Sequence, residues 1–322
     1  MLRWRGLDDI PADWGRCVVT IGVFDGVHRG HAQLIKAATT AAAERGLPSV
    51  LMTFDPHPAE VVRPGTHPPQ LSTLTRRAEL AQELGIDVFC VMPFTPALAS
   101  RSPKDFVHGV LVETLHAAEV VVGDNFTFGH KAAGNVEKLR EFGKRFGFEV
   151  QEVSLFGEHA VTFSSTYIRS CVAAGDVTSA ADALGRPHRV EGVVVRGDGR
   201  GRELGFPTAN VAPPMYAAIP ADGVYACSFT VIGPGATLGQ VQHGKCYQAA
   251  VSVGTNPTFS GRTRTVEAFV LDTEADLYGQ HVAVDFVERI RPMTRFDSVD
   301  DLVKAIAEDV DQTRVILAKH AE

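Results

Sequence analysis

Two hydrophobic patterns follow one another along the chain, and they predict two different kinds of domain. Up to about residue 156, short β-branched runs alternate with amphipathic segments of helical period. Each run is expected to form a buried strand and each amphipathic segment a covering helix. The expected strands are 17–23, 49–54, 87–92, 119–122 and 149–155, and the expected helices are about 30–45, 73–84, 103–116 and 135–146. This alternation predicts an α/β domain with a doubly wound parallel sheet.

From about residue 187 the pattern changes to Val-rich runs separated by turn-rich loops, which is typical of an antiparallel sheet or small β-barrel. The expected strands are 189–196, 223–231, 246–253, 264–272 and 281–288. A terminal helix over 297–319 is expected to begin after Asp297 and Ser298. We therefore predict an N-terminal domain over residues 1–186 and a C-terminal domain over residues 187–322.

The composition and net charge of the chain limit the kinds of molecule that it can bind. The chain has 322 residues, of which 45% are hydrophobic and 21% charged, and its formal net charge is −7. Neither half is strongly basic, so we expect no surface for nucleic acid or anionic membrane.

The five cysteines form no CxxC pair, which indicates reduced thiols. No apolar run approaches the roughly 18 residues of a membrane span. The first ten residues carry two acids where a signal peptide is apolar. We expect a cytoplasmic protein with small-molecule substrates, and leave open a homo-oligomer.

Polar, Gly- and Pro-rich segments follow the expected strands of the first domain. FDGVHRGH follows the first strand, DPHP the second and GDNFTFG the fourth, while FSSTYIR comes shortly after the fifth. Sheets of this kind bind ligands at the carboxyl ends of their strands, where the strand order reverses. The sequence therefore predicts a ligand crevice at this edge.

The segment GVFDGVHRGH connects the first strand to a helix and has the chemistry of a phosphate site. Gly22 and Gly26 permit a tight turn, and Gly30 allows close approach of a ligand to the backbone. His28 and His31 share a face of the first helical turn, where N–H groups and the helix dipole attract anions. Two imidazoles there are suited to hydrogen-bond a phosphoryl group in the transition state.

A second glycine-rich segment, GDGRGRELGFPTAN (197–210), opens the C-terminal domain. Its backbone is able to wrap phosphates, and Arg200 and Arg202 add positive charge. Thr208 and Asn210 alternate in an extended segment, so their side chains point the same way. A hydroxyl and an amide oxygen suit Mg²⁺. Taken alone, a glycine-rich turn in a β-barrel explains this segment equally well.

Other residues also have a purely structural interpretation. His28 and His31 fit surface positions or a metal site, although no Cys/His partner at zinc spacing accompanies them. Glu267 lies in an alternating run, where an outward-facing strand acid is the simpler interpretation from the residues alone. His57 stands between two prolines and fits a role in fixing the turn.

These motifs carry a resemblance to a known family. GVFDGVHRGH resembles the signature of nucleotidyltransferases with an HIGH-type motif. Together with TFDPHP (53–58), GDNFTFG (123–129) and SSTYIR (164–169), it is similar to the adenylyltransferase half of bacterial bifunctional riboflavin kinase/FMN adenylyltransferases, the prokaryotic FAD synthetases. The glycine-rich segment is similar to the riboflavin kinase signature. GVYA, SVGTNPTF, VEAFVLD, DLYGQ and ERIRPM follow in the order of that family. The resemblance spans nearly the whole chain.

The resemblance implies two reactions that use ATP: phosphorylation of riboflavin to FMN in the C-terminal domain, and adenylylation of FMN to FAD with release of pyrophosphate in the N-terminal domain. His28 and His31 would be the catalytic residues of the second reaction. The other residues implied to bind ATP there are Gly22, Phe24, Asp25, Gly26, Gly30, Ser164, Ser165, Thr166 and Arg169. Those implied to bind FMN are Phe54, Pro56, His57, Pro58, Asp124, Asn125 and Phe126.

For the kinase, the resemblance makes Glu267 the general base and Thr208 and Asn210 the residues that hold Mg²⁺. The residues implied to bind ATP or flavin are Gly199, Arg200, Gly201, Arg202, Gly205, Pro207, Asn256 and Arg291. The chain departs from many relatives at two positions. Asn125 stands where they have an acid before Phe126, and Phe269 stands where they have a histidine.

Two other classes of function compete with this interpretation. One keeps only the N-terminal activity on another acceptor, as in cytidylyltransferases or pantetheine-phosphate adenylyltransferases. The form of the motif SSTYIR and the C-terminal half that resembles riboflavin kinase argue against this alternative. The other is a non-catalytic flavin-binding protein, which would be expected to have lost His28, His31 or Glu267.

Overall fold

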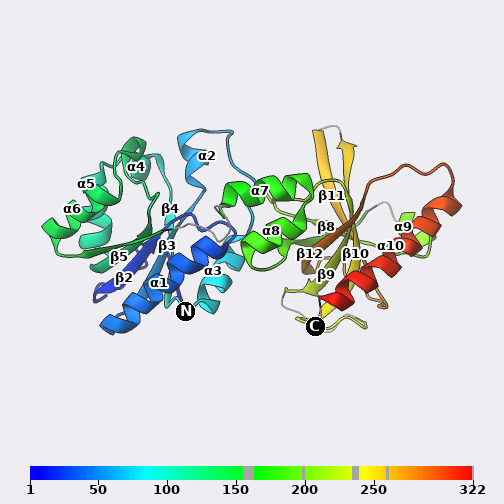
Figure 1. The fold of residues 1–322 in the computed structure, drawn as a ribbon, viewed down its shortest axis with the longest axis horizontal. Helices are drawn as coiled ribbons and strands as arrows, with labels where there is room; N and C mark the ends of the chain where they lie inside the picture. Colours follow the sequence, from blue (N-terminus) through cyan, green and yellow to red (C-terminus); the bar gives the residue numbers. More distant parts are fainter. Residues whose placement is uncertain (155–162, 198–199, 234–238, 259–260, 321–322) are drawn as a thin grey trace. The chain divides into compact units, whose positions relative to one another are not determined.

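The protein is described by a computed structural model that covers residues 1–154, 163–197, 200–233, 239–258 and 261–320 (Figure 1). Its internal contacts group the chain into two compact units. The first comprises Met1–Pro68 and Leu74–Ser164, and the second Pro69–Thr73 and Ser165–Glu322. The helices between residues 165 and 184 thus group with the C-terminal unit, whereas the sequence places the boundary after them. The limits 1–186 and 187–322 stay a prediction.

A six-stranded, fully parallel sheet forms the first unit, as the hydrophobic pattern predicts (Figure 1). The strand order is β1-β4-β3-β2-β5-β6, so the direction of strand addition reverses at β2. The strands are β1 Leu2–Arg5, β2 Cys17–Ile21, β3 Ser49–Asp55, β4 Val88–Pro93, β5 Ala117–Gly123 and β6 Glu149–Val153. Every residue of β2 and β5 is buried, as expected for strands covered on both faces. The sequence analysis missed β1, because four residues are too few to establish a period.

Helices cover both faces of this sheet. On one face, α1 (Arg29–Arg45) and α3 (Leu74–Glu83) share a hydrophobic core with β2, β3 and β4. On the other face lie α5 (Pro103–Phe106), the π-helix η1 (Val107–Val112) and α6 (Val136–Phe146). The expected helix over 103–116 thus ends at Val112, in a wide π-turn with hydrogen bonds from residue i+5 to residue i. The short elements of this unit are α2 Pro58–Val62, α4 Pro96–Ala99 and η2 His130–Ala132.

The second unit contains a closed antiparallel barrel, which confirms the predicted fold class. The strand order is β10-β11-β8-β7-β12-β9. The strands are β7 His188–Val195, β8 Ala209–Ala212, β9 Gly223–Val231, β10 Cys246–Thr258, β11 Gly261–Val270 and β12 His281–Pro292. The helices are α7 Ser165–Ala174, α8 Val177–Leu184, α9 Arg200–Glu203 and α10 Val299–Lys319. Ser298 caps α10 at its N-terminus, as the sequence predicts.

Strands β10 and β11 are longer than their hydrophobic runs. Their backbones stay paired from Ala249 and Val270 to Thr258 and Gly261. Among the residues of β10 whose side chains the structure describes, Val253 is the last that is fully buried, and Gly254 and Thr255 after it are partly exposed. The barrel core therefore accounts for the hydrophobic pattern, while the remaining pairing leaves no such signal in the sequence.

Candidate functional sites

The first candidate site is the loop from β2 to α1, at the point where the order of the parallel sheet reverses. Strand β2 pairs with β3 on one side and β5 on the other, so the carboxyl ends of these three strands are neighbours. The residues that follow them include the three segments predicted from sequence: 22–31, 54–58 and 124–126. A sheet of this type binds its ligands at this edge.

His28 and His31 form a stacked pair in this loop. Their ring centroids lie 3.7 Å apart with an angle of 22° between the planes. His28 is buried and serves as the N-cap of α1, where its Nδ1 accepts a hydrogen bond of 3.3 Å from the backbone N–H of His31. A neutral imidazole with Nδ1 as acceptor carries its proton on Nε2. The pair therefore stands at a helix N-terminus, as predicted.

The backbone of the loop is strained. Phe24 and Val27 have φ values of 51° and 39°, in the left-handed region that L-residues rarely occupy. Both side chains are buried, which provides the packing that holds them there. Strained backbone of this kind concentrates at functional loops.

A buried arginine from α3 fastens the same loop. Arg77 Nη1 donates to the carbonyl oxygen of Val23 at 2.9 Å, and its Nη2 lies 3.3 Å from Asp25 Oδ1. Thr53 Oγ1 also donates to Val23 O, at 2.9 Å. The side chains of Arg77 and Asp25 are only 4% and 2% exposed. Sequence analysis missed Arg77, because a single arginine in an amphipathic helix gives no sign of being buried.

The residues predicted to bind FMN lie at the ends of β3 and β5. Phe54 contacts Phe94 edge to face at 5.5 Å, and His57 caps the short helix α2 by accepting from Ala59 N–H at 3.1 Å. His57 therefore helps to fix the turn between Pro56 and Pro58, which is the structural role that the sequence allowed. Asp124 and Asn125 are exposed after β5.

The segment SSTYIR begins a helix, as expected for hydroxyl groups that meet phosphate at a helix N-terminus. Helix α7 starts at Ser165, and Thr166 in its first turn is exposed. Arg169 donates from Nε to the carbonyl oxygen of Pro69 at 2.7 Å, within the second unit. That these residues bind ATP stays a prediction.

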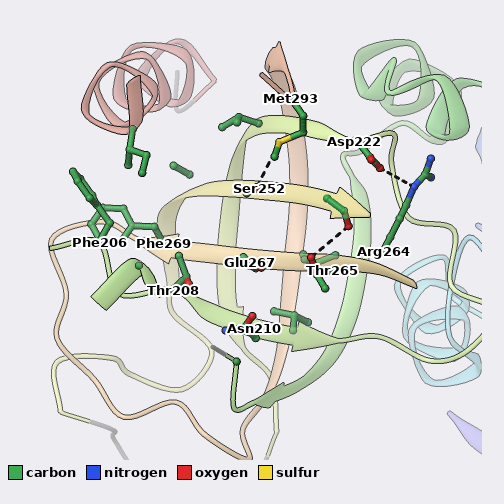
Figure 2. Close-up of a pocket in the computed structure, with 18 of the residues that line it drawn as sticks. Phe206, Thr208, Asn210, Asp222, Ser252, Arg264, Thr265, Glu267, Phe269 and Met293 are labelled. Atoms are coloured by element: carbon green, nitrogen blue, oxygen red, sulfur yellow. Dashed lines mark hydrogen bonds and ion pairs between the residues drawn. The ribbon is translucent and has the colours of Figure 1, made fainter. Parts of the chain in front are cut away.

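The second candidate site is a cavity of about 1150 Å³ on the barrel of the second unit. Its polar wall comes from β8, β10 and β11. In the strand register, Glu267 of β11 stands beside Asn210 of β8 on one side and Ser252 of β10 on the other (Figure 2). Ala209, Val211, Val266 and Ala268 are buried in the barrel core. Because side chains alternate along a strand, Asn210 and Glu267 face the cavity.

Thr208 directly precedes β8 and lines the same wall as Asn210 (Figure 2). The predicted alternation is therefore present. Gly197 packs against the side-chain amide of Asn210, so closely that a Cβ at residue 197 would overlap it. This explains why a glycine stands at that position of the loop.

Apolar side chains also line the cavity. Phe206 and Phe269 meet edge to face at 5.4 Å between ring centroids, so that Phe269 joins the strand of Glu267 to the glycine-rich segment (Figure 2). Val299, Leu302 and Ile306 of α10 also line the cavity. A cavity with one apolar wall and a few convergent polar groups suits a planar organic ligand with a polar tail.

Of the remaining predicted kinase residues, Gly201 and Arg291 line the cavity. Arg202, Gly205 and Pro207 are exposed beside it. Gly199 lies outside the residues that the structure describes, as do the side chains of Arg200 and Asn256. Sequence analysis missed Asp309, which holds Arg291 in a bidentate ion pair.

Cysteines and metal-ligating clusters add no further site. Burial raises the pKa of the Cys17 and Cys90 thiols to about 12, so both stay protonated and serve as buried packing residues. In the described part of the chain, no group of three or more His, Cys, Asp or Glu residues is arranged to hold a metal ion. Among the same residues, no helix is both long and apolar enough to cross a membrane.

The two folds and their candidate sites indicate an enzyme of the transferase class, and comparisons with known proteins give its family. The family model for FAD synthetase matches residues 10–167, and that for riboflavin kinase matches residues 184–317. The bifunctional riboflavin kinase/FMN adenylyltransferase of Escherichia coli K12 is 36% identical over 306 residues, which cover 95% of this chain and 94% of the relative. The protein of the same name from Pseudomonas fluorescens is 35% identical, with 98% of both chains covered. The chain belongs to this family of bifunctional enzymes.

A solved structure matches the fold over the same extent. It is the crystal structure of a protein from Streptococcus pneumoniae that bears the name "Macrolide-efflux Protein". The two chains are 32% identical with a TM-score of 0.86, and the match covers 98% of this chain and 99% of the other. The fold of this chain is thus shared by a solved structure along nearly its full length.

Proposed function

We propose that this chain makes FAD in two steps: it phosphorylates riboflavin to FMN with ATP, and then adenylylates FMN with a second ATP, releasing pyrophosphate. The observation that carries the proposal is that two family models, one for each activity, match consecutive parts of the chain. The curated relatives that share both parts carry both activities in their name.

In the kinase step, Glu267 would accept the proton of the riboflavin 5′-hydroxyl. The hydroxyl oxygen then bonds to the γ-phosphorus of ATP while the bond from that phosphorus to the β–γ bridging oxygen breaks, and ADP leaves. A carboxylate within reach of the attacking hydroxyl is what phosphoryl transfer to an alcohol requires. The position of Glu267 on the cavity wall, beside Asn210, supports this role.

Thr208 and Asn210 are proposed to hold Mg²⁺ together with the ATP phosphates. Their hydroxyl and amide oxygens are hard donors on one wall of the cavity, and such a small donor set suits a cation that keeps several waters. When bound, Mg²⁺ would neutralise charge on the transferred phosphoryl group. The side-chain amide of Asn210, packed on Gly197, is held in place for this contact.

In the adenylylation step, an FMN phosphate oxygen attacks the α-phosphorus of ATP and pyrophosphate leaves. No protein nucleophile is required, so positioning and charge stabilisation supply the rate. His28 and His31 are proposed to donate hydrogen bonds to the ATP phosphates. Their support is the stacked geometry at the N-terminus of α1 and the loop that Arg77 fastens.

The same proposal assigns FMN to the ends of β3 and β5, and the ATP phosphates also to Ser164, Ser165, Thr166 and Arg169. It takes residues 1–186 and 187–322 as the limits of the two functional domains. A cytoplasmic location belongs to the proposal as well, because both substrates of the first step are small soluble molecules.

The test is to incubate the purified protein with riboflavin, ATP and Mg²⁺ and to follow the flavins by chromatography. FMN is expected first and FAD afterwards. Absence of both products would refute the proposal, and accumulation of FMN without FAD would refute its N-terminal half. Addition of a metal chelator at the start is expected to prevent FMN formation.

A further inference from the structure

Helix α10 consists of two halves with different surroundings. In its second half, Asp309, Val310, Thr313 and Leu317 are buried, and Val310 packs with Ala250 and Leu271 of the barrel. In its first half no residue is buried. That half instead contributes Val299, Leu302 and Ile306 to the cavity, at the spacing of one helix face. The second half therefore anchors the helix, and the first half, together with Asp309, lines the kinase cavity.

An ion pair stands at the junction of these halves. Arg291 of β12 donates from Nε and Nη2 to the two carboxylate oxygens of Asp309, at 2.8 and 2.7 Å. The Asp309 side chain is 6% exposed and that of Arg291 is 25% exposed. A bidentate pair between a planar guanidinium and a carboxylate fixes direction as well as distance. It thus fixes the direction of α10 at the point where its buried half ends and its cavity-lining half begins.

A second Arg–Asp pair on the same helix provides a contrast. Arg314 of α10 lies 2.7 Å from Asp272 at the end of β11, but the two side chains are 41% and 73% exposed. Neither residue lines the cavity. Exposed pairs of this kind contribute little. The two pairs share chemistry and length, and differ in burial and in distance from the cavity along the helix.

We propose that Arg291 and Asp309 are a positioning pair, which fixes the first half of α10 and thereby sets the affinity of the kinase site for its flavin. This inference rests on the proposed kinase activity of the second unit. Arg291 here acts through Asp309. If Arg291 were instead a direct ligand of the substrates, its contribution would not depend on Asp309.

The test compares Asp309→Asn with the control Asp272→Asn in the full-length chain. Asp309→Asn is expected to raise both the KM for riboflavin and its Kd, measured by quenching of flavin fluorescence, by about tenfold, the factor that corresponds to one lost charge-assisted hydrogen bond. The kcat for FMN formation should change by less than about twofold, because Glu267 is untouched. Asp272→Asn should leave the KM and Kd for riboflavin unchanged. The rate of FAD formation from supplied FMN should be unchanged in both variants. Arg291→Lys keeps the charge but loses the bidentate geometry, and should give part of the effect.

The decisive comparison is a double-mutant cycle. In the Asp309→Asn background, Arg291→Met should raise the riboflavin Kd much less than it does alone, because the pair is already broken. Additive effects, or an unchanged Kd in Asp309→Asn, or equal effects in Asp309→Asn and Asp272→Asn, would overturn the inference. If an Asp309 variant fails to fold, the inference is decided by Arg291→Lys, whose unchanged riboflavin Kd would refute it. A wild-type protein that forms no FMN would instead refute the proposed function.

Discussion

The two candidate sites are built in opposite ways. The histidine pair of the first site is local: His28 caps α1 and His31 lies in its first turn, and the loop before them is held by buried side chains and by the buried Arg77. The second is assembled from distant parts of the chain: Asn210 and Glu267 meet through strand register, and the first half of α10, in which no residue is fully buried, lines the cavity. This difference means that a loop fixed by its own buried contacts can be recognised from contiguous residues, whereas a cavity wall made by strand register and a helix face cannot.

Loss of the kinase base should have the largest effect. Glu267→Gln removes the proton acceptor while keeping the size of the side chain, and FMN formation should fall by about 10²–10⁴-fold. FAD formation from supplied FMN should persist. The control is Glu288→Gln, an exposed strand acid of β12 outside the cavity lining. FMN formation within tenfold of wild type in Glu267→Gln would remove Glu267 from the mechanism.

A change in the histidine pair should have a similar effect in the other unit. His28→Ala removes one donor to the phosphates and the N-cap of α1, so FAD formation should fall by about 10²–10³-fold. Riboflavin phosphorylation, assayed on the same preparation, should be unchanged. His108→Ala, at a half-exposed histidine of η1, serves as the control. Equal loss of both activities would contradict the separation of the sites.

Arg77→Met tests whether the first loop is held as rigidly as its contacts suggest. The variant leaves Asp25 buried without its ion-pair partner and should lower the free energy of unfolding of the first unit by about 3–5 kcal/mol. The displaced loop should slow FAD formation by about 10²-fold. Both tryptophans, Trp4 and Trp14, lie in the first unit, so urea unfolding followed by tryptophan fluorescence reports on that unit.

The matched control for this prediction is the neighbouring Arg76. Its side chain is 17% exposed, against 4% for Arg77, and it forms ion pairs with Glu79 and Glu83, whose carboxylates are 45% and 61% exposed and regain water when Arg76 is removed. Arg76→Met should therefore cost less than about 1 kcal/mol. An equal effect of the two variants would show that Arg77 has no special role in the loop.

Removal of the cap of α10 should have the smallest effect. Ser298 accepts from Asp301 N–H at 3.1 Å and donates to its carboxylate at 2.6 Å, and Ser102 makes the same two contacts with Asp105 in the first unit. Ser298→Ala should cost about 1 kcal/mol of helix stability and raise the riboflavin KM by about two- to fivefold. Ser102→Ala should leave that KM unchanged. An unchanged KM in both variants would indicate that the first turn of α10 does not shape the cavity.

The same contrast between the sites explains what the sequence could predict. The histidine pair could be predicted from sequence because one contiguous segment contains the strand, the two histidines and the helix. The spacing of the residues alone therefore describes the geometry. Thr208 and Asn210 were placed on one face for the same reason. The parallel sheet and the barrel followed from the period of buried residues.

The rest depends on contacts that leave no local pattern. Glu267 was singled out only through the family resemblance, because the register that brings it beside Asn210 is not encoded in either strand alone. Arg77 and Asp309 are charged residues in amphipathic helices, where exposure is the usual expectation. Their burial is decided by partners far away in the chain, Asp25 and Arg291.

The most direct test of two separate sites is a mixing experiment with His28→Ala and Glu267→Gln, each supplied with riboflavin, ATP and Mg²⁺. His28→Ala alone should accumulate FMN, and Glu267→Gln alone should leave riboflavin unchanged. The mixture should form FAD, because FMN released by the first variant is adenylylated by the second. If His28→Ala forms no FMN, or if the mixture forms no more FAD than either variant alone, the two reactions do not occupy the separate sites described above.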